Sequence, residues 1–474
     1  MEVTIMRKIK ILLFISILLS FFSCTKIEKA DLAITNVTLI DATGAPAQSD
    51  MTVLIVDNQI IKIGKADKLK VANEVQVIDG SGKFLIPGLW DMHVHWFKKE
   101  YLPLFIANGV TGIRVMWGTP EHLQWRRELA EGKLLCPRME IGSPIIDGPN
   151  PMWPGSIAIS NAEEARAAVH RFKDEGYDFI KVLNNLPREA FLAIAEECEK
   201  LEIPFAGHFP FTISSAEAVE AGLNSNEHLI SILRFCSTQE EEFREELTKL
   251  IAAKTPWMKM MPMWLGQRAQ YLETYDQKKA DLLFKQLAQH KIWQCPTLTV
   301  NRSAANISNA DFRNDPRVRY MPSDIMANWN KPRPLPPFIS LMLRKTFQKY
   351  LELIKPMQEA GVRFLAGTDV FNPFCFPGFS LHDELDLLVQ GGLTPMEALQ
   401  AATRNAAEYL GRLDSLGTIE PGKIADLVLL DADPLIDIRN TQKINAVVFD
   451  GKLFKKADLQ KMLQDIEALA STKS

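Results

Sequence analysis

His93 and His95 are the clearest chemical feature of the sequence, in the run Asp91-Met92-His93-Val94-His95 that follows Pro87-Gly88. The two histidines stand two residues apart in an apolar stretch, so on a β-strand both side chains point to the same face. Imidazole is the common protein ligand for zinc-like ions. A lone histidine on such a strand would suit a core equally well, but this pair predicts a metal site at the strand end.

Lys181 lies in the apolar run Phe179-Ile180-Lys181-Val182. A charged ammonium is costly to bury there, which leaves two interpretations open. The side chain could extend past the strand end to keep its charge in water. Alternatively, carbon dioxide could carboxylate the amine, and the carbamate oxygens could then bridge two metal ions. The burial that disfavours the ammonium favours this second interpretation.

Three further residues end short apolar stretches. His208 closes residues 204–208, His228 follows Asn226-Glu227, and Asp369 closes residues 364–369. Each histidine alone could be structural, but together with His93, His95 and Lys181 they are candidate ligands of a second metal. Asp369 could hold one metal, take the proton of the attacking nucleophile and deliver it to the leaving group.

The elements that must position these residues alternate between apolar strands and helices. Helices are predicted over 162–175, 189–201 and 215–222. The pattern predicts an α/β fold, a (β/α)₈ TIM barrel over residues 87–410 with its chemistry at the carboxyl ends of the strands. The eight predicted strands are 88–95, 109–116, 138–146, 177–183, 204–208, 225–230, 293–300 and 362–369.

Two segments fit no strand–helix unit, residues 256–266 with Trp257 and Trp264, and residues 301–337. Both follow predicted barrel strands, so we expect long loops above the active site. Such loops are typically lids or binding segments, although an insertion that only pads the surface is the alternative.

Both ends of the chain are rich in short strands. Residues 31–86 and 411–456 are predicted to form a small composite β-sandwich, and residues 457–474 a closing amphipathic helix. The pattern in 31–86 is typical of strands joined by turns, with Asp57-Asn58 as a hairpin turn. This domain carries no chemistry of its own.

The first 24 residues are typical of a signal peptide. Arg7, Lys8 and Lys10 precede the apolar run 11–22, which is too short to span a bilayer. Ser23-Cys24 resembles a bacterial lipobox, which predicts lipidation of Cys24 and membrane attachment through that lipid. We therefore expect an exported protein of the bacterial cell envelope, facing the periplasm or the exterior. Ordinary secretion or a retained anchor is the alternative.

Composition excludes several other classes. The chain has 474 residues and a formal net charge of −4, with no basic excess that would indicate a nucleic-acid partner. Neither a GxGxxG motif, a P-loop nor a GxSxG motif occurs. Six scattered cysteines without a CxxC pair are typical of small buried hydrophobes rather than of a disulfide framework.

Taken together, these motifs resemble the metal-dependent amidohydrolase superfamily. Pro87-Gly88-Leu89, the His93–His95 pair, Lys181, His208, His228 and Asp369 carry the resemblance, which covers roughly residues 31–450. The segment 417–427 resembles the β-domain of that superfamily. The chain looks most similar to the branch related to imidazolonepropionase, which includes Xaa-Pro dipeptidase-like enzymes.

The resemblance implies a site with two divalent metal ions, usually zinc. His93, His95 and Asp369 would bind one ion, His208 and His228 the other, and carboxylated Lys181 would bridge them. A metal-bridging hydroxide would attack a peptide-like or cyclic amide of a small molecule, with Asp369 as general base and acid. A lactone, carboxylester or phosphotriester is the alternative substrate. An inactive lipid-anchored binding protein is disfavoured because all six ligand positions are filled.

Two residues are candidate substrate contacts. The planar fork of Arg114 suits a substrate carboxylate, and a structural salt bridge is the alternative. His382 could line the substrate pocket or pack at the start of a helix over 383–390. Association of the chain into a homo-oligomer is left open.

Overall fold

The structure is a computed structural model that describes residues 29–331 and 335–472. The predicted signal peptide, with Cys24, lies outside the described residues. Within them, no helix is both long enough and apolar enough to cross a membrane. The five cysteines in this part of the chain are all buried and unpaired, as predicted.

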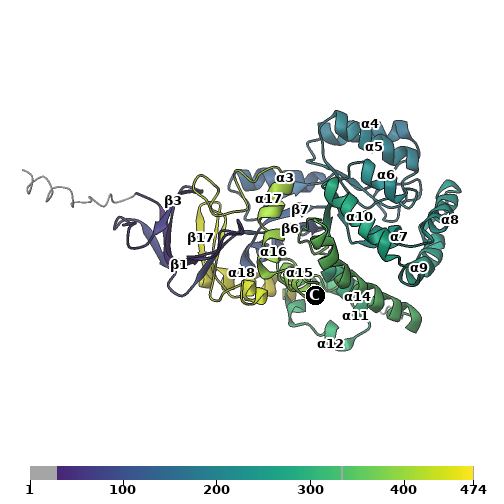
Figure 1. Ribbon diagram of the computed structural model, residues 1–474. Helices are drawn as coiled ribbons and strands as arrows, with labels where there is room; N and C mark the ends of the chain where they lie inside the picture. Colours follow the sequence, from purple (N-terminus) through teal and green to yellow (C-terminus); the bar gives the residue numbers. More distant parts are fainter. Residues whose placement is uncertain (1–28, 332–334, 473–474) are drawn as a thin grey trace, which may run out of the picture.

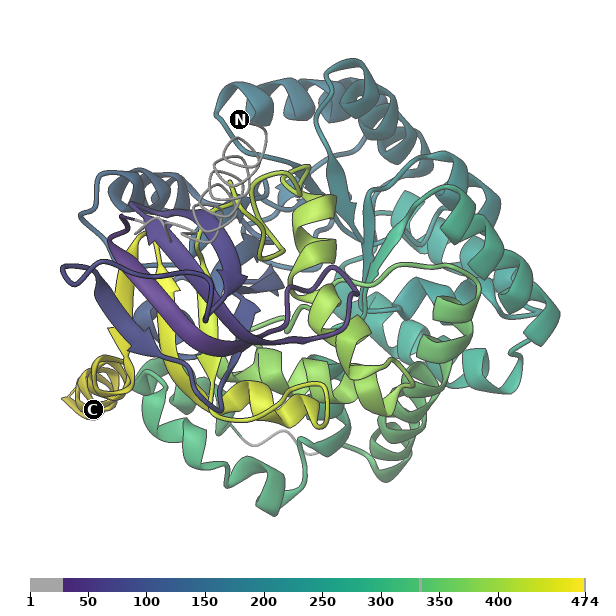
Figure 2. The same ribbon diagram turned by 60° about the vertical axis from the view of Figure 1, so that its left-hand side comes forward.

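Strands from both ends of the chain form one eight-stranded sheet, in the order β17-β16-β15-β5-β1-β2-β3 with β4 beside β1. Figure 2 shows the purple N-terminal strands and the yellow C-terminal strands side by side. Hydrogen bonds join them into a single sheet, where the prediction had a sandwich. The strands are β1 (Leu32–Leu39), β2 (Gln48–Val56), β3 (Gln59–Lys65), β4 (Gln76–Asp79), β5 (Phe84–Pro87), β15 (Leu427–Leu430), β16 (Ile444–Phe449) and β17 (Lys452–Lys455).

The middle of the chain carries short parallel strands in two further sheets. A three-stranded sheet has the order β6-β7-β8, and a six-stranded sheet has the order β10-β9-β11-β12-β13-β14. Most of these strands are buried on both faces, as parallel sheets covered by helices require. Their bounds are β6 (Leu89–Val94), β7 (Val110–Val115), β8 (Arg138–Ile141), β9 (Ile146–Asp147), β10 (Ile157–Ala158), β11 (Ile180–Val182), β12 (Phe205–Gly207), β13 (Ser225–Glu227) and β14 (Trp293–Cys295).

Isolated parallel bridges connect these two sheets. Gly142 pairs with Phe179, which links β8 to β11, and Gln294 pairs with Phe364 beyond β14. Val370 then pairs with Val94 of β6. The parallel segments therefore follow one another around a closed circuit.

The predicted eighth strand, residues 362–369, is not a regular strand. Its backbone still bonds on both sides: Leu365 N donates to Gln294 O (2.9 Å) and Asp369 N donates to His93 O (2.9 Å). Asp369 has a φ of 59°, in the left-handed region that interrupts a strand. The prediction of a full strand is wrong because only isolated bridges form and Ala366 N donates to Ala401 O (3.0 Å) outside the parallel segments, although the segment occupies the predicted place.

Helices cover the outside of the parallel strands (Figures 1 and 2). In α4, Asn161 caps the first turn by accepting from Glu164 N, and an apolar stripe faces inward. The helices are η2 (Lys99–Tyr101), α2 (Pro103–Ala107), α3 (Pro120–Ala130), α4 (Ala162–Asp174), α5 (Arg188–Lys200), α6 (Ser215–Glu220), α7 (Ile230–Phe235), α8 (Glu240–Ala252), α9 (Trp257–Glu273), α10 (Gln277–Gln289), α11 (Leu298–Asn306), α12 (Ala310–Arg313), η3 (Pro316–Tyr320), α13 (Ser323–Trp329), α14 (Pro337–Glu359), α15 (Phe379–Gln390), α16 (Pro395–Ala401), α17 (Arg404–Tyr409), η4 (Ile438–Gln442) and α18 (Lys456–Thr472).

Helices replace both predicted long loops. Residues 256–266 lie almost entirely in α9, and residues 301–331 hold the end of α11 followed by α12, η3 and α13. Pro262 inside α9 concealed the helix from sequence reasoning, because proline usually ends one. The expectation of loops is therefore wrong.

Candidate functional site

The six predicted ligands lie at or just beyond the carboxyl ends of the parallel segments. His93 is in β6 and Lys181 in β11, while His208 and His228 directly follow β12 and β13. His228 has a φ of 68° and Asp369 one of 59°. Non-glycine residues held in this region indicate local strain that the surrounding structure maintains, and such strain is concentrated at functional sites.

His93, His95 and Asp369 converge on one point. The Nε2 atoms of the two histidines are 3.1 Å apart, and Asp369 Oδ1 lies 3.5 Å from His93 Nε2 and 3.2 Å from His95 Nε2. Two imidazole nitrogens and a carboxylate oxygen this close are a donor set that suits a divalent cation.

The partners of the other ring nitrogens orient three histidines. His93 Nδ1 lies 2.7 Å from Glu227 Oε2, and His208 Nδ1 lies 2.6 Å from Asn184 Oδ1. His228 Nδ1 lies 2.6 Å from Thr297 Oγ1, whose own proton goes to Pro296 O. Each partner accepts, so each Nδ1 donates and leaves the Nε2 lone pair free for a metal.

A buried ion pair between Arg114 and Glu227 holds this arrangement in place. Arg114 donates to Glu227 Oε1 (2.9 Å), to Ser225 Oγ (2.7 Å) and to Met92 O (2.6 Å). Burial by itself would raise the pKa of Glu227, but Arg114 and Lys181 lower it below its usual value. Glu227 therefore stays ionised and fixes the ring of His93.

Lys181 is buried, and its Nζ has no hydrogen-bond partner among the described residues. Burial lowers the pKa of this amine to about 8. A buried amine without a partner is expensive unless something else uses it. The orphaned atom therefore fits a lysine that is chemically modified or that contacts a bound group.

Burial also sets the charge of the remaining ligands. It lowers the pKa values of His93 and His208 well below the usual range and that of His228 to about 4. Burial opposes ionisation of Asp369, yet the surrounding histidines hold the pKa of Asp369 far below its usual value. Neutral imidazoles beside an ionised carboxylate are the protonation states that metal binding requires.

Asp91 connects the two segments that carry these ligands. It accepts from His93 N (3.2 Å), from Thr368 N (3.0 Å) and from Thr368 Oγ1 (2.6 Å). Gly367 leaves no room for a side chain, because an added Cβ would lie 2.5 Å from Cys295 Sγ and 2.8 Å from His93 Cβ. This close approach holds Asp369 against the histidine pair.

The ligands open into a cavity of about 300 Å³. His95, Lys181, His208, His228 and Asp369 line it, whereas His93 lies below its floor. The rest of the lining is mainly aromatic and aliphatic: Phe97, Trp117, Ile145, Met152, Trp153, Leu183, Asn184, Ile230, Trp264, Arg268, Val300, Asn301, Ala304, Phe371 and Asn372. An apolar cavity with a few convergent polar groups is the usual form of a small-molecule site.

The profile of one protein family matches residues 84–454, which span the closed circuit of parallel segments and all six ligand positions. Its description is "Amidohydrolase family". The chain belongs to the amidohydrolase family. The predicted resemblance is thereby confirmed.

Among curated relatives, the chain is similar to imidazolonepropionase of Geobacillus kaustophilus (strain HTA426), with 37% identity over 107 residues. It is also similar to ochratoxinase of Aspergillus niger, with 36% identity over 118 residues. The matches cover 20% and 24% of this chain. They span about a quarter of each relative's length, 25% and 24%.

Solved structures share the fold over nearly the whole chain. A bottromycin amidohydrolase superimposes with a TM-score of 0.73 at 22% identity, covering 92% of this chain and 90% of the other. A Xaa-Pro dipeptidase with bound methionine gives a TM-score of 0.66 at 20% identity, covering 90% and 99%. At these identities the likeness concerns the fold.

The two predicted substrate contacts are wrong. Arg114 is fully buried outside the cavity, and its guanidinium is committed to Glu227, Ser225 and Met92. His382 is 1% exposed and lies between Thr441 Oγ1 (2.9 Å) and Asn108 O (3.0 Å). Neither ring nor guanidinium reaches the site.

Sequence reasoning missed the residues that orient the ligands. Glu227, Asn184 and Thr297 bond the Nδ1 atoms, yet only Glu227 stands next to a predicted ligand. A buried acid within a three-residue strand was a usable signal. Asn184 and Thr297 carried none, because their partners are 24 and 69 residues away.

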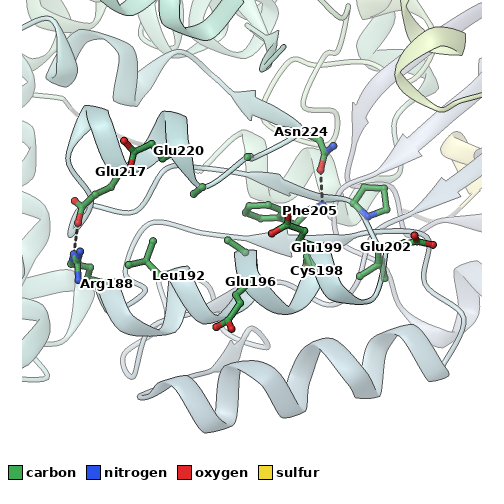
Figure 3. Close-up of a pocket in the computed structure, with 15 residues that line it drawn as sticks. Arg188, Leu192, Glu196, Cys198, Glu199, Glu202, Phe205, Glu217, Glu220 and Asn224 are labelled. Carbon is green, nitrogen blue, oxygen red and sulfur yellow. Dashed lines mark hydrogen bonds and ion pairs between the residues drawn. The ribbon is translucent and has the colours of Figure 1, made fainter. Parts of the chain in front are cut away.

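A second, larger cavity lies away from the candidate ligands. It has a volume of about 640 Å³, lies between α5 and α6, and includes the start of β12 and Asn224 just before β13 (Figure 3). Five glutamates and Arg188 border it, and Arg188 pairs with Glu217. Glu196 pairs with Arg166 and Lys200, and Asn224 Oδ1 accepts from Phe205 N, so the described residues here offer no convergent set of unpaired donors.

Proposed function

We propose that this amidohydrolase-family protein is a metal-dependent hydrolase of carbon–nitrogen bonds that cleaves an amide of a small molecule. The convergence of His93 Nε2, His95 Nε2 and Asp369 Oδ1 at the floor of an apolar cavity carries the proposal. Two solved neighbours, named as a bottromycin amidohydrolase and a Xaa-Pro dipeptidase, support it.

Two divalent ions, of which zinc suits the donors best, would polarise the scissile carbonyl and lower the pKa of water when bound. His93, His95 and Asp369 would hold one ion, and His208 and His228 the other. Lys181 would bridge them after its neutral amine reacts with carbon dioxide, forming an N–C bond and releasing one proton. Its depressed pKa and its orphaned Nζ favour that reaction.

Asp369 would move the proton. Its carboxylate is ionised, faces the cavity and lies within 3.5 Å of both histidines. It would accept a proton from the attacking water as the C–O bond forms, then donate it to the amine nitrogen as the C–N bond breaks. The products are a carboxylic acid and an amine.

The same proposal covers the rest of the chain. The closed circuit of parallel segments between 87 and 410 would be a (β/α)₈ barrel. Residues 31–86 and 411–456 would form the attached β-domain, with the terminal helix after it. The leader ending at Cys24 would export the protein to the bacterial cell envelope and attach it to the membrane by lipid.

The direct test measures metal and activity on the same sample. Purified protein loaded with zinc should bind about two ions per chain and hydrolyse members of a panel of dipeptides and N-acyl amino acids. Chelated protein should be inactive. With ¹³C-labelled bicarbonate, a carbamate carbon signal should appear and be absent from Lys181→Met. Full metal loading with no activity on the amide panel, or activity that survives chelation, would refute the proposal.

Lys200→Met provides the matched control for that lysine. Lys200 is a half-exposed lysine on α5 that pairs with Glu196 (3.0 Å), away from the ligands. Its replacement should leave metal content, the carbamate signal and activity unchanged. A carbamate signal that persists in Lys181→Met would show that another amine is modified.

A further inference from the structure

Arg268 is the one arginine among the described residues that line the active-site cavity. It lies on α9 and is only 9% exposed. The carboxylate-binding arginine anticipated at position 114 is thus absent from the cavity, and a different arginine occupies its wall.

No carboxylate forms an ion pair with Arg268 within residues 29–331 and 335–472. Its guanidinium lies 4.9 Å from the ring centroid of Trp264 and interacts with the phenol of Tyr350, both neutral groups. Arg114, by contrast, is neutralised by Glu227 at 2.9 Å. Burying a cation without a counterion is unfavourable, so a charge held in this way is poised for an external anion.

The two walls of the cavity differ in character. Phe97, Trp117 and Phe371 form an aromatic cluster: the Phe97 ring centroid lies 6.1 Å from that of Trp117 and 5.9 Å from that of Phe371. Trp117 lies 6.4 Å from His95. These contacts place the aromatic cluster beside the first histidine pair, with no formal charge in it.

Arg268 belongs to the other wall. Its guanidinium lies over the ring of Trp264, and the centroid of that ring is 6.3 Å from that of Phe211. Phe211 is three residues beyond His208. An amide held among the histidines would therefore have an apolar wall on one side and a cation on the other. The cavity of about 300 Å³ suits a ligand of dipeptide size.

We propose, on the basis of the hydrolase function above, that the substrate is an N-acyl amino acid with a large apolar acyl group. Its free carboxylate binds Arg268, whose planar fork can donate two parallel hydrogen bonds to it. Its acyl group packs on the cluster of Phe97, Trp117 and Phe371. Arg268 acts here as a specificity-determining residue rather than as part of the bond-breaking machinery.

A matched substrate pair tests the carboxylate. N-benzoyl-L-phenylalanine and N-benzoylphenethylamine share the scissile amide and both rings, and differ only in the carboxylate. Wild-type zinc-loaded enzyme should prefer the acid in kcat/KM by about 100-fold, because an unpaired buried cation penalises the analogue. N-acetyl-L-phenylalanine should be poorer than the benzoyl substrate. An enzyme that hydrolyses acid and analogue equally would overturn the proposal without touching the hydrolase function.

Substitutions assign that preference to one side chain. Arg268→Gln should lower kcat/KM for the acid at least tenfold and leave kcat/KM for the analogue within about threefold of wild type. The preference for the acid over the analogue is then largely lost. Arg268→Lys should fall between. Arg188→Gln, at the second cavity, should behave as wild type. If Arg268 had only a structural role, its replacement would lower kcat/KM for the acid and for the analogue by the same factor. That result would also contradict the proposal.

A binding measurement separates the two proposals. N-(benzenesulfonyl)-L-phenylalanine has the same carboxylate and ring but no scissile carbonyl, so calorimetric titration reports recognition without turnover. Wild type should bind it, and Arg268→Gln should bind it at least tenfold more weakly. Recognition that depends on Arg268 in a protein that cleaves no amide would refute the hydrolase function alone. Equal affinity in wild type and Arg268→Gln would refute the carboxylate site.

Discussion

The two cavities of this molecule differ in the way that matters for chemistry. The cavity between α5 and α6 has about 640 Å³, twice the volume of the one above the ligands, at about 300 Å³. Its glutamates are exposed or paired with neighbours such as Arg188, Arg166 and Lys200. Groups that water or a partner already satisfies have little to offer a ligand.

The smaller cavity holds polar atoms that the protein leaves unsatisfied. Lys181 Nζ and His95 Nδ1 have no hydrogen-bond partner among the described residues, and Arg268 has no carboxylate partner there. Keeping such groups buried costs stability, which a bound metal or substrate would restore. Unsatisfied buried groups, rather than volume, thus distinguish a site from a surface cleft.

The largest expected effect follows from replacing one carboxylate in each cavity. Asp369→Asn should lower kcat by about 1,000-fold, because an amide cannot accept and return a proton. Glu199→Gln, the same chemical change in the larger cavity, should leave kcat within about twofold. Steady-state assays of both variants at matched metal content measure this. Equal losses in the two variants would break the distinction drawn between the cavities.

Much of this arrangement could be predicted from the sequence, because parallel strands end on one side. The apolar runs around His93, Lys181, His208 and His228 predicted that these four candidate ligands lie at carboxyl ends of strands, and the structure has them there. The segment before Asp369 is not a regular strand, because Ala366 N donates to Ala401 O outside the parallel segments, and no hydrophobic pattern reveals that bond. Helix α9 was missed because Pro262 and its methionines obscured its periodicity.

The next effect concerns stability. Glu227→Gln leaves Arg114 buried beside a neutral amide that cannot accept from both Arg114 and His93. We expect a loss of about 3 kcal/mol in the free energy of unfolding, since an unpaired buried charge remains. Chemical denaturation of the metal-free protein measures it and keeps metal binding out of the comparison.

Glu217→Gln is the matched control in the larger cavity. Glu217 pairs with exposed Arg188 and completes a capping box with Ser214, which glutamine can also form. Its replacement should cost less than about 1 kcal/mol. If Glu217→Gln lost as much free energy of unfolding as Glu227→Gln, burial would not explain the difference expected between the two glutamates.

The orienting partners of the ligands mark what sequence reasoning cannot reach. Arg114 was predicted as a substrate contact, with a structural salt bridge only as the alternative, because its acceptor Glu227 lies 113 residues away. Nothing in the sequence indicated a role for Arg268, because an arginine on a helix is usually exposed at the surface. Only the fold shows that it lines a cavity. Side-chain partners depend on tertiary contacts, whereas strand ends depend on local pattern.

The smallest expected effect tests whether zinc affinity also depends on the residues that orient the histidines. Thr297→Val keeps the β-branched shape at a residue with a φ of 46° but removes the acceptor of His228 Nδ1. Zinc affinity, measured by competition with a chromophoric chelator, should fall by about tenfold. Thr346→Val, at a buried hydroxyl that donates to Met342 Sδ (3.7 Å), should leave the zinc affinity unchanged. Because Pro296 O still accepts from Asn301 (3.3 Å), the loss in Thr297→Val should come from the freed histidine. If the zinc affinity of Thr297→Val is unchanged, metal binding depends on the candidate ligands themselves and not on the residues that orient them.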